Sequence, residues 1–209
     1  MAAIELFRQT LLRLLETRRT IVIFLVAVLP ALIAPAIASR SQFPLAFDRA
    51  FFNSMFYFYF WFIMMFVTLI NCINITHSEI EDGTVTYSAR IVLKRWLIVL
   101  WKQFAVILYS WIIISCGIFL TYFTTQADKF DISVPVNYSF IALAGCFMYC
   151  SVYTLCGYLF RSPVSGALLI TFFVEVVLTH LPAKFSFYTI TNTLRAMIVA
   201  SFPALTSKY

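Results

Sequence analysis

Apolar residues along the chain fall into long runs separated by short polar stretches, a pattern that predicts membrane-spanning helices. Ahead of the first run, residues 2–19 place apolar side chains at helical spacing, with charged side chains around the rest of the helical wheel. We therefore expect residues 1–19 to form an amphipathic interfacial helix that lies on the membrane surface. Residues 20–209 are expected to form a single transmembrane domain.

Five apolar runs are long enough to cross the roughly 30 Å hydrocarbon core of a bilayer. The first contains Pro30 and Pro35, which we expect to bend or loosen it. The five expected spans are Thr20–Ala38, Phe51–Thr76, Trp96–Phe123, Val136–Phe160 and Val164–Leu181. Residues 182–209 contain no apolar run of comparable length. They predict a surface or re-entrant segment, although a distorted sixth span within residues 186–203 stays open.

The composition excludes a water-soluble globular protein. The 209 residues are 62% hydrophobic and 11% charged, with a mean hydropathy of +0.91, whereas a soluble domain is about 45–50% apolar and about 25% charged. The net charge of +6 comes from Lys and Arg near the ends of the spans, so it does not indicate a nucleic-acid surface. Nine Lys and Arg lie on the side of the N-terminus and six on the other side, which predicts a cytoplasmic N-terminus. The expected fold class is an all-α integral membrane protein.

No motif in the chain predicts an enzyme. The phosphate-binding loop of ATPases, the paired-histidine zinc motif and the nucleophile motif of serine hydrolases are all absent from the sequence. The five cysteines fall in apolar runs and are expected to be buried thiols. Cys146, Met148 and Cys150 share one expected helix and could in principle bind a soft ion such as Cu(I). Nothing else completes that site, so we expect no metal or cofactor on this chain.

Glu175 is the one carboxylate inside an expected span. A charge deep in a bilayer costs on the order of 3 kcal/mol or more unless it is protonated, paired or hydrated, so Glu175 is expected to face the interior of the bundle. Thr171 and Thr179 lie four residues to either side and extend a polar stripe along the same helix. Two interpretations stay open. In the first, these residues line a translocation path. In the second, Glu175 lies near the outer interface, where it is hydrogen-bonded to neighbouring helices or hydrated.

A strongly polar stretch, residues 77–95, lies between the second and third spans on the side of the N-terminus. It begins with acidic residues, passes through a Gly-Thr turn and continues into a basic helix that returns to the membrane. The acidic part with its turn comprises Glu79, Glu81, Asp82, Gly83 and Thr84, and the basic part comprises Arg90, Lys94 and Arg95. We call residues 77–95 the elbow. Taken alone, a solvated loop without a partner would also explain it.

The elbow resembles the signature of the type-2 ATP-binding-cassette (ABC) permeases, in which a stretch of the form E-x-E-x-G-T ends the second span and a basic turn opens the third. The matching positions are Glu79, Glu81, Gly83, Thr84, Tyr87, Ile91-Val92, Arg95 and Lys102. The usual proline of that turn is replaced by Arg90 and Ile91. An N-terminal amphipathic helix, a short hinge at Leu159 to Pro163 and the Leu181-Pro182 pair follow the family's order. Members usually have six spans, whereas the pattern here predicts five.

This resemblance implies the permease subunit of an ABC exporter in the cytoplasmic membrane of a bacterium or archaeon. It implies that residues 79–84 contact a separate ATPase subunit, which holds ATP and Mg²⁺, and that Arg90, Lys94 and Arg95 lie near lipid headgroups or the partner. It also implies that a second permease chain pairs with this one around the translocation path. The apolar spans favour a hydrophobic or amphipathic substrate. The alternative is a non-transporting membrane scaffold that anchors or recruits a partner protein and still needs the elbow.

Overall fold

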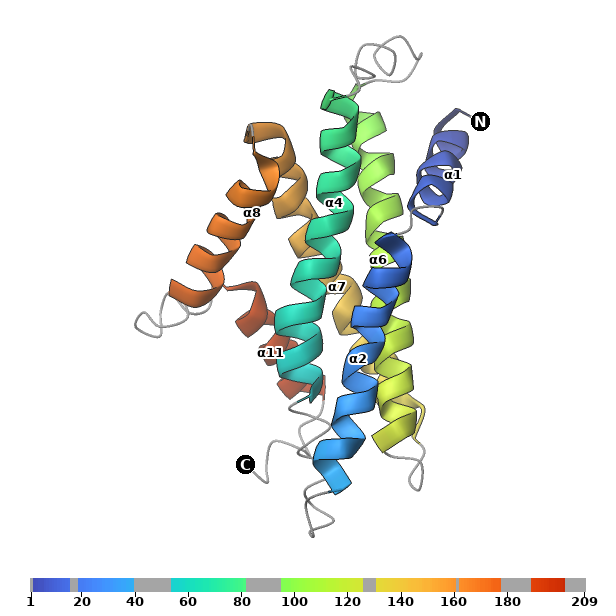
Figure 1. Ribbon diagram of the computed structural model, residues 1–209, viewed down its shortest axis with the longest axis vertical. Coiled ribbons are helices and arrows are strands. Elements are labelled where there is room, and N and C mark those ends of the chain that lie inside the picture. Colours follow the sequence, from blue (N-terminus) through green and yellow to red (C-terminus); the bar gives the residue numbers. More distant parts are fainter. Residues whose placement is uncertain are drawn as a thin grey trace.

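The structure of the chain, a computed structural model, describes residues 2–15, 19–39, 54–81, 95–125, 131–160, 162–177 and 189–201 (Figure 1). For some residues in these helices it describes only the backbone; they are residues 2–4, 19, 21, 34–39, 54–58, 74–81, 95, 125, 176–177 and 199. Every element within these ranges is helical, with seven α-helices and two π-helical segments, so the all-α prediction is confirmed. The elements are α1 (Ala2–Leu15), α2 (Arg19–Ser39), η1 (Ser54–Ile63), α4 (Met64–Glu81), α6 (Arg95–Thr125), α7 (Ser133–Leu159), α8 (Pro163–Phe172), η2 (Phe173–Val177) and α11 (Ile190–Ser201).

The helices follow the expected spans closely wherever an apolar run is long and uncharged. The helices α2, α6 and α7 begin and end within three residues of the predicted bounds. The second expected span corresponds to η1 followed directly by α4, which continues through Glu81. Residues 77–81 are therefore helical, so the acidic beginning of the elbow continues the helix of the second expected span.

Two of the described helices are long and apolar enough to cross a membrane, judged by length and composition. They are residues Trp96–Thr124 within α6 and Ser133–Leu159, which is α7. The apolar parts of α2, of η1–α4 and of α8–η2 are shorter helices. The helix count thus differs from an interfacial helix with five spans, and within the described residues only α6 and α7 combine the length and the apolar composition of a span.

The C-terminal part of the chain departs most from expectation. The fifth expected span corresponds to α8, which begins with Pro163 in its first turn, and to η2, which follows it from Phe173 to Val177. The last four residues of that expected span, 178–181, lie outside the described residues. Within the tail that was expected to be a surface or re-entrant segment, α11 packs into the bundle and buries Leu194 and Ile198 completely. The helix α11 therefore does not lie on the surface alone, and the re-entrant segment and the distorted sixth span both stay predictions.

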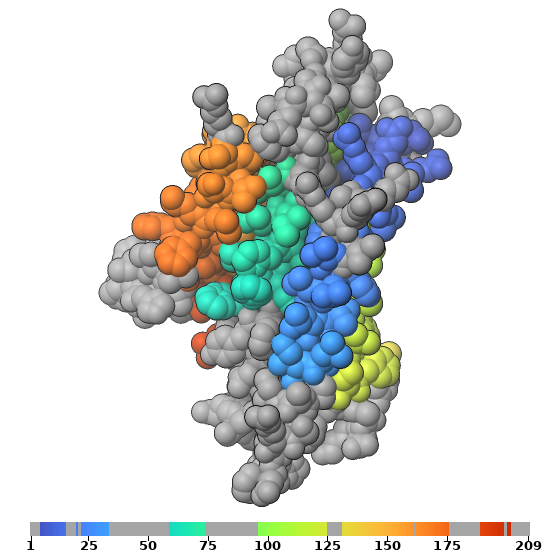
Figure 2. Space-filling view, in the orientation of Figure 1, coloured from blue at the N-terminus to red at the C-terminus, as the bar shows by residue number. Residues whose placement is uncertain are grey.

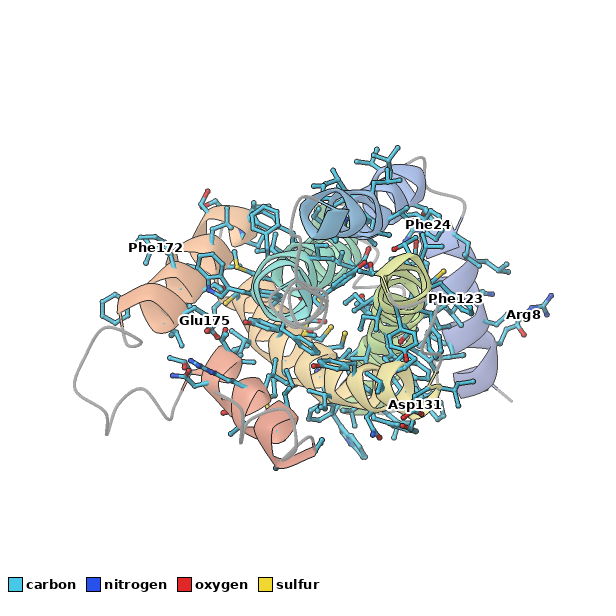
Figure 3. The ribbon with its side chains drawn as sticks, turned by 90° about the horizontal axis from the view of Figure 1, so that it is seen from below. Arg8, Phe24, Phe123, Asp131, Phe172 and Glu175 are labelled. Carbon is cyan, nitrogen blue, oxygen red and sulfur yellow. The ribbon has the colours of Figure 1, made fainter. Side chains whose placement is uncertain are left out.

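The helix α6 organises the bundle, because it packs against α1, α2, α4 and α7 (Figures 1 and 3). In turn, α7 packs against α4, α8 and α11. Figure 2 shows α8, α4 and α2 side by side on one face. Aromatic side chains with a hydroxyl group fill much of the core; those that are fully buried are Tyr59, Tyr122, Tyr138, Tyr149 and Tyr153.

A close approach of α2 to α6 depends on small residues. A Cβ atom added at Gly117 would lie 2.7 Å from the carbonyl oxygen of Ala27 and 2.9 Å from the ring of Tyr59. Ala27 and Ala31, which face α6, are also buried. Small residues at helix contacts are what lets backbones approach closely in membrane bundles, where packing replaces the hydrophobic drive between helices.

Side-chain hydroxyl groups join α2, η1 and α6. The Tyr59 hydroxyl group donates to the carbonyl oxygen of Ala27 at 3.0 Å and shares a hydrogen bond of 2.7 Å with Thr121 Oγ1. Thr124 Oγ1 donates to the carbonyl oxygen of Ala31 at 3.2 Å. Since Pro35 stands four residues after Ala31 and has no N–H, Thr124 supplies the donor that the helix itself lacks there. This compensation is consistent with α2 remaining one helix through its prolines.

The N-terminal helix α1 runs obliquely along α6, not apart from the bundle (Figures 1 and 3). The Phe7 ring lies 6.3 Å from the Trp101 ring and 6.2 Å from the Phe104 ring, measured between centroids, and Leu14 is buried. Part of the apolar face that was expected to lie on the membrane is thus covered by α6, whereas Leu15 on that face remains 56% exposed. Arg8 remains exposed on the opposite face, beside Glu5.

Candidate functional site

Glu175 lies on η2, where the helix widens into π-helical turns directly after α8 (Figure 3). Only 5% of this residue is exposed to solvent. π-Helical turns are rare and occur frequently at functional sites. The prediction that Glu175 faces the interior of the bundle is confirmed by its burial.

The Glu175 carboxylate accepts hydrogen bonds from two other helices. Oε1 accepts from the backbone N–H of Ile190 at 3.1 Å and from the Tyr149 hydroxyl group at 3.2 Å. Oε2 accepts from the backbone N–H of Thr191 at 3.3 Å and from the Thr191 hydroxyl group. Both oxygens are therefore bound to donors at the beginning of α11 and on α7.

This geometry places a carboxylate at the N-terminus of α11. The first N–H groups of a helix have no acceptor within the helix, and the N-terminus carries the positive end of the helix dipole. Glu175 accepts from the first two of these N–H groups, and Thr189 Oγ1 accepts the third, from Asn192, at 3.4 Å. The helix is capped locally by Thr189 and from a distant part of the chain by Glu175.

Thr171 extends the polar face of α8 toward α7, one helical turn before Glu175. Its Oγ1 donates to the Tyr153 hydroxyl oxygen at 3.1 Å. The rings of Tyr149 and Tyr153 stack with centroids 5.9 Å apart. We call Thr171, Glu175, Tyr149, Tyr153 and Thr191 the Glu175 cluster. Thr179, the third residue of the predicted stripe, lies outside the described residues.

Two interpretations of Glu175 were open from the sequence, and the contacts support the structural one. Each oxygen of the carboxylate is occupied by donors from the fold itself. The sequence indicated neither Tyr149 nor Thr191 as partners of Glu175. The spacing of Tyr149 and Tyr153, one turn apart, and the threonines that begin α11 were the available signals.

The cysteine prediction holds for four thiols and fails for one. Cys72, Cys146, Cys150 and Cys156 are buried, whereas Cys116 is exposed on α6. Cys72 Sγ lies 3.9 Å from the carbonyl oxygen of Cys150. In the described part of the chain, no group of three or more His, Cys, Asp or Glu side chains is placed to hold a metal ion.

The elbow is described only at its two ends. Glu81 is the last residue of α4, Glu79 lies in its last turn, and Arg95 is the first residue of α6. The remaining predicted residues, Asp82, Gly83, Thr84, Arg90 and Lys94, lie outside the described residues. The C-terminal end of α4, the N-terminal end of α6, helix α1 and the junction between α7 and α8 all gather at one end of the bundle (Figure 1).

Among known proteins, no family model, no curated protein and no solved structure matches this chain. The resemblance to the type-2 ABC permeases therefore stays a prediction that rests on the order of motifs in the sequence.

Proposed function

We propose that the chain is the membrane-spanning permease subunit of an ABC exporter, which docks a separate ATPase through the elbow and moves a hydrophobic or amphipathic substrate. The observation that carries the proposal is the shared end of the bundle in Figure 1. Helix α1, both helical ends of the elbow and the α7–α8 junction lie there together, on the side that the Lys and Arg distribution predicts to be cytoplasmic. ATP and Mg²⁺ belong to the ATPase, and a second permease chain completes the path.

The outer surface of the bundle supports placement in a membrane. Large apolar side chains are exposed on most of the described helices, among them Leu32 on α2 at 72%, Leu159 on α7 at 68% and Leu169 on α8 at 70%. Monomeric soluble proteins rarely expose contiguous apolar patches of more than a few hundred Å². At about 1.5 Å per residue, the 31 residues of α6 and the 27 of α7 also exceed the roughly 30 Å of a hydrocarbon core.

The two helices at the ends of the elbow could transmit a movement of the elbow into the bundle. Helix α4 ends at Glu81 and α6 begins at Arg95, and the two are joined inside the bundle by Asn71 Nδ2, which donates to Ser110 Oγ at 3.0 Å. A displacement of the elbow would move both helices together. ATP-driven closure of the ATPase could then favour one packing of the bundle over another, which is the differential interaction that such a switch requires.

Co-purification tests the proposal. The tagged chain is extracted from its native membranes in mild detergent, bound proteins are identified, and ATPase activity is measured. We expect a nucleotide-binding subunit to accompany the chain and to be lost when Glu81→Arg is combined with Asp82→Arg. The matched control reverses two acidic residues elsewhere, Glu5→Arg with Asp131→Arg, and is expected to retain the subunit because both residues are exposed and lie outside the elbow.

Equal ATPase recovery with both double variants would reject the elbow as the docking surface. Absence of an ATPase across several detergents would favour the scaffold function. One observation already favours that second candidate: the buried carboxylate expected to line a path is instead bound at every oxygen to the fold.

A further inference from the structure

Two short helices, α8 and α11, are found in the C-terminal part of the chain, where the sequence predicted a fifth span followed by a tail. At no more than about 1.5 Å per residue, the 15 described residues of α8 and η2 extend at most about 23 Å and the twelve of α11 about 18 Å, so neither described segment crosses a bilayer core of about 30 Å. In Figure 1, α8 descends from the end that holds α1 and stops part-way along α7. Helix α11 begins near that level and runs toward the end where α2 finishes.

The junction of these two helices needs an acceptor from outside α11. The first N–H groups of α11 lie inside the bundle and have no acceptor within the helix. A buried N–H group without an acceptor costs free energy comparable to a lost hydrogen bond. Glu175 meets this need for Ile190 and Thr191, and it does so from η2, the segment that ends α8. The end of one helix is thus tied to the beginning of the other through a single side chain.

Farther along α11, the contacts are apolar. Leu194 and Ile198 are fully buried, and α11 packs against α7 and η1. The helix is therefore held in two ways, by packing along its length and by the Glu175 hydrogen bonds at its N-terminus. Within the described residues, the hydrogen bonds of Glu175 connect α11 to η2.

We propose that α8–η2 and α11 act as one interrupted span, and that the Glu175 carboxylate is the latch that holds α11 in the bundle. Release of the latch frees the N-terminal part of α11 while the packing of α6 with α7 persists. Glu175 is a positioning residue in this scheme. The inference stands on the described contacts and does not rest on the docking of an ATPase, so either can fail without the other.

Hydrogen–deuterium exchange on the full chain in mild detergent tests the latch. In Glu175→Gln we expect amides of residues 190–201 to exchange roughly tenfold faster or more, because charge-assisted bonds at the helix N-terminus are lost. Peptides from α6 and α7 are expected to exchange at the original rate. Unchanged exchange in α11, or an equal increase in all three helices, would overturn the proposal.

Variants on other helices keep the test decisive if Glu175→Gln fails to fold. Thr191→Val removes one donor to Glu175 and keeps the carboxylate, so it should accelerate exchange in residues 190–201 by a smaller factor, while Thr191→Ser keeps the hydroxyl group and should not. Thr171→Val is the matched control on α8. It removes the bond to Tyr153 without touching α11. Two results would show that Glu175 is not the latch: faster amide exchange in α11 of Thr171→Val, or an unchanged exchange rate in α11 of Thr191→Val.

Discussion

The helix pairs α6–α7 and α8–α11 satisfy their backbone hydrogen-bonding groups in different ways. The first pair is continuous over 31 and 27 residues, so that nearly all of its backbone groups are paired within the helices themselves. The bonds between these two helices are additions to that pairing, such as Trp111 Nε1 donating to the carbonyl oxygen of Ser139 at 2.8 Å. The second pair is interrupted inside the bundle, so helix-end donors require acceptors from elsewhere.

This difference shows where a polar side chain is structurally necessary. In α6–α7, the Ser115 and Ser139 hydroxyl groups lie 2.6 Å apart and satisfy one another, and loss of both would leave the backbone paired. In α8–α11, loss of Glu175 would leave backbone N–H groups at Ile190 and Thr191 without the acceptor they have now. The continuous pair should therefore respond most to changes in packing, and the interrupted pair to changes in hydrogen bonding.

The largest expected effect comes from a matched pair of glycine substitutions. Gly117→Ala places a Cβ atom 2.7 Å from the backbone oxygen of Ala27, which cannot turn away, so we expect a loss of about 2 kcal/mol in unfolding free energy. The atoms nearest to a Cβ added at Gly166 belong to the side chain of Phe160, Cγ at 2.6 Å and Cβ at 3.1 Å. Since Phe160 is 41% exposed, its ring can rotate outward and only its Cβ has to shift slightly.

Thermal unfolding in detergent compares the two glycine variants. Because Ala favours a helix over Gly by about 1 kcal/mol, Gly166→Ala should leave the unfolding temperature equal or higher. A similar loss in both variants would show that the interrupted pair is packed as tightly as the contact of α2 with α6.

Two tyrosine substitutions separate global from local effects. Tyr59→Phe and Tyr149→Phe each remove a buried hydroxyl group from a hydrogen-bonded site, with an expected cost of about 1 kcal/mol apiece. Tyr59→Phe should lower the unfolding temperature of the whole bundle, because it joins α2, η1 and α6. Tyr149→Phe should mainly increase proteolysis or exchange within α11. Identical local profiles for the two variants would contradict the distinction between the regions.

How much of this could be predicted from the sequence depends on what determines each element. The bounds of α2, α6 and α7 follow from long uncharged runs, because a bilayer-length apolar helix satisfies its own backbone. The change to π-helical turns after Phe172 could not be predicted, since the residues from Ala167 to Val177 are apolar apart from Thr171 and Glu175 and continue a helical pattern. The sequence showed that Glu175 needed partners. That those partners were Tyr149 and the beginning of α11 was determined by tertiary packing.

A smaller effect is expected where a proline interrupts the otherwise continuous α2. Thr124→Val removes the donor to the carbonyl oxygen of Ala31 and should cost about 0.5–1 kcal/mol. In a Pro35→Ala background, position 35 regains an N–H for that oxygen, so the same substitution should cost less. A double-mutant cycle on unfolding temperature measures the difference. Additive costs would show that Thr124 does not compensate for the proline.

The smallest expected effect concerns a second carboxylate that caps a helix, this time at the surface. Asp131 is exposed, and its Oδ1 accepts the backbone N–H of Ser133 at 3.0 Å, where α7 begins. Hydrogen bonds from the Ser133 side chain and backbone lower the pKa of Asp131 below its ordinary value of 3.8. With a lowered folded-state pKa, this group stabilises the fold above its ordinary pKa, and the contribution disappears as the pH falls through the folded pKa.

Asp131→Asn keeps an acceptor and removes only the charge, so it isolates that contribution. We expect the unfolding temperatures of the original chain and Asp131→Asn to differ slightly at about pH 6 and to approach one another as the pH falls below 3.8. A constant difference across this range would show that the charge does not stabilise the helix end. Water also solvates the Asp131 carboxylate. Substitution of Asp131 should therefore lower the stability far less than substitution of Glu175, which caps a helix in the same way inside the bundle.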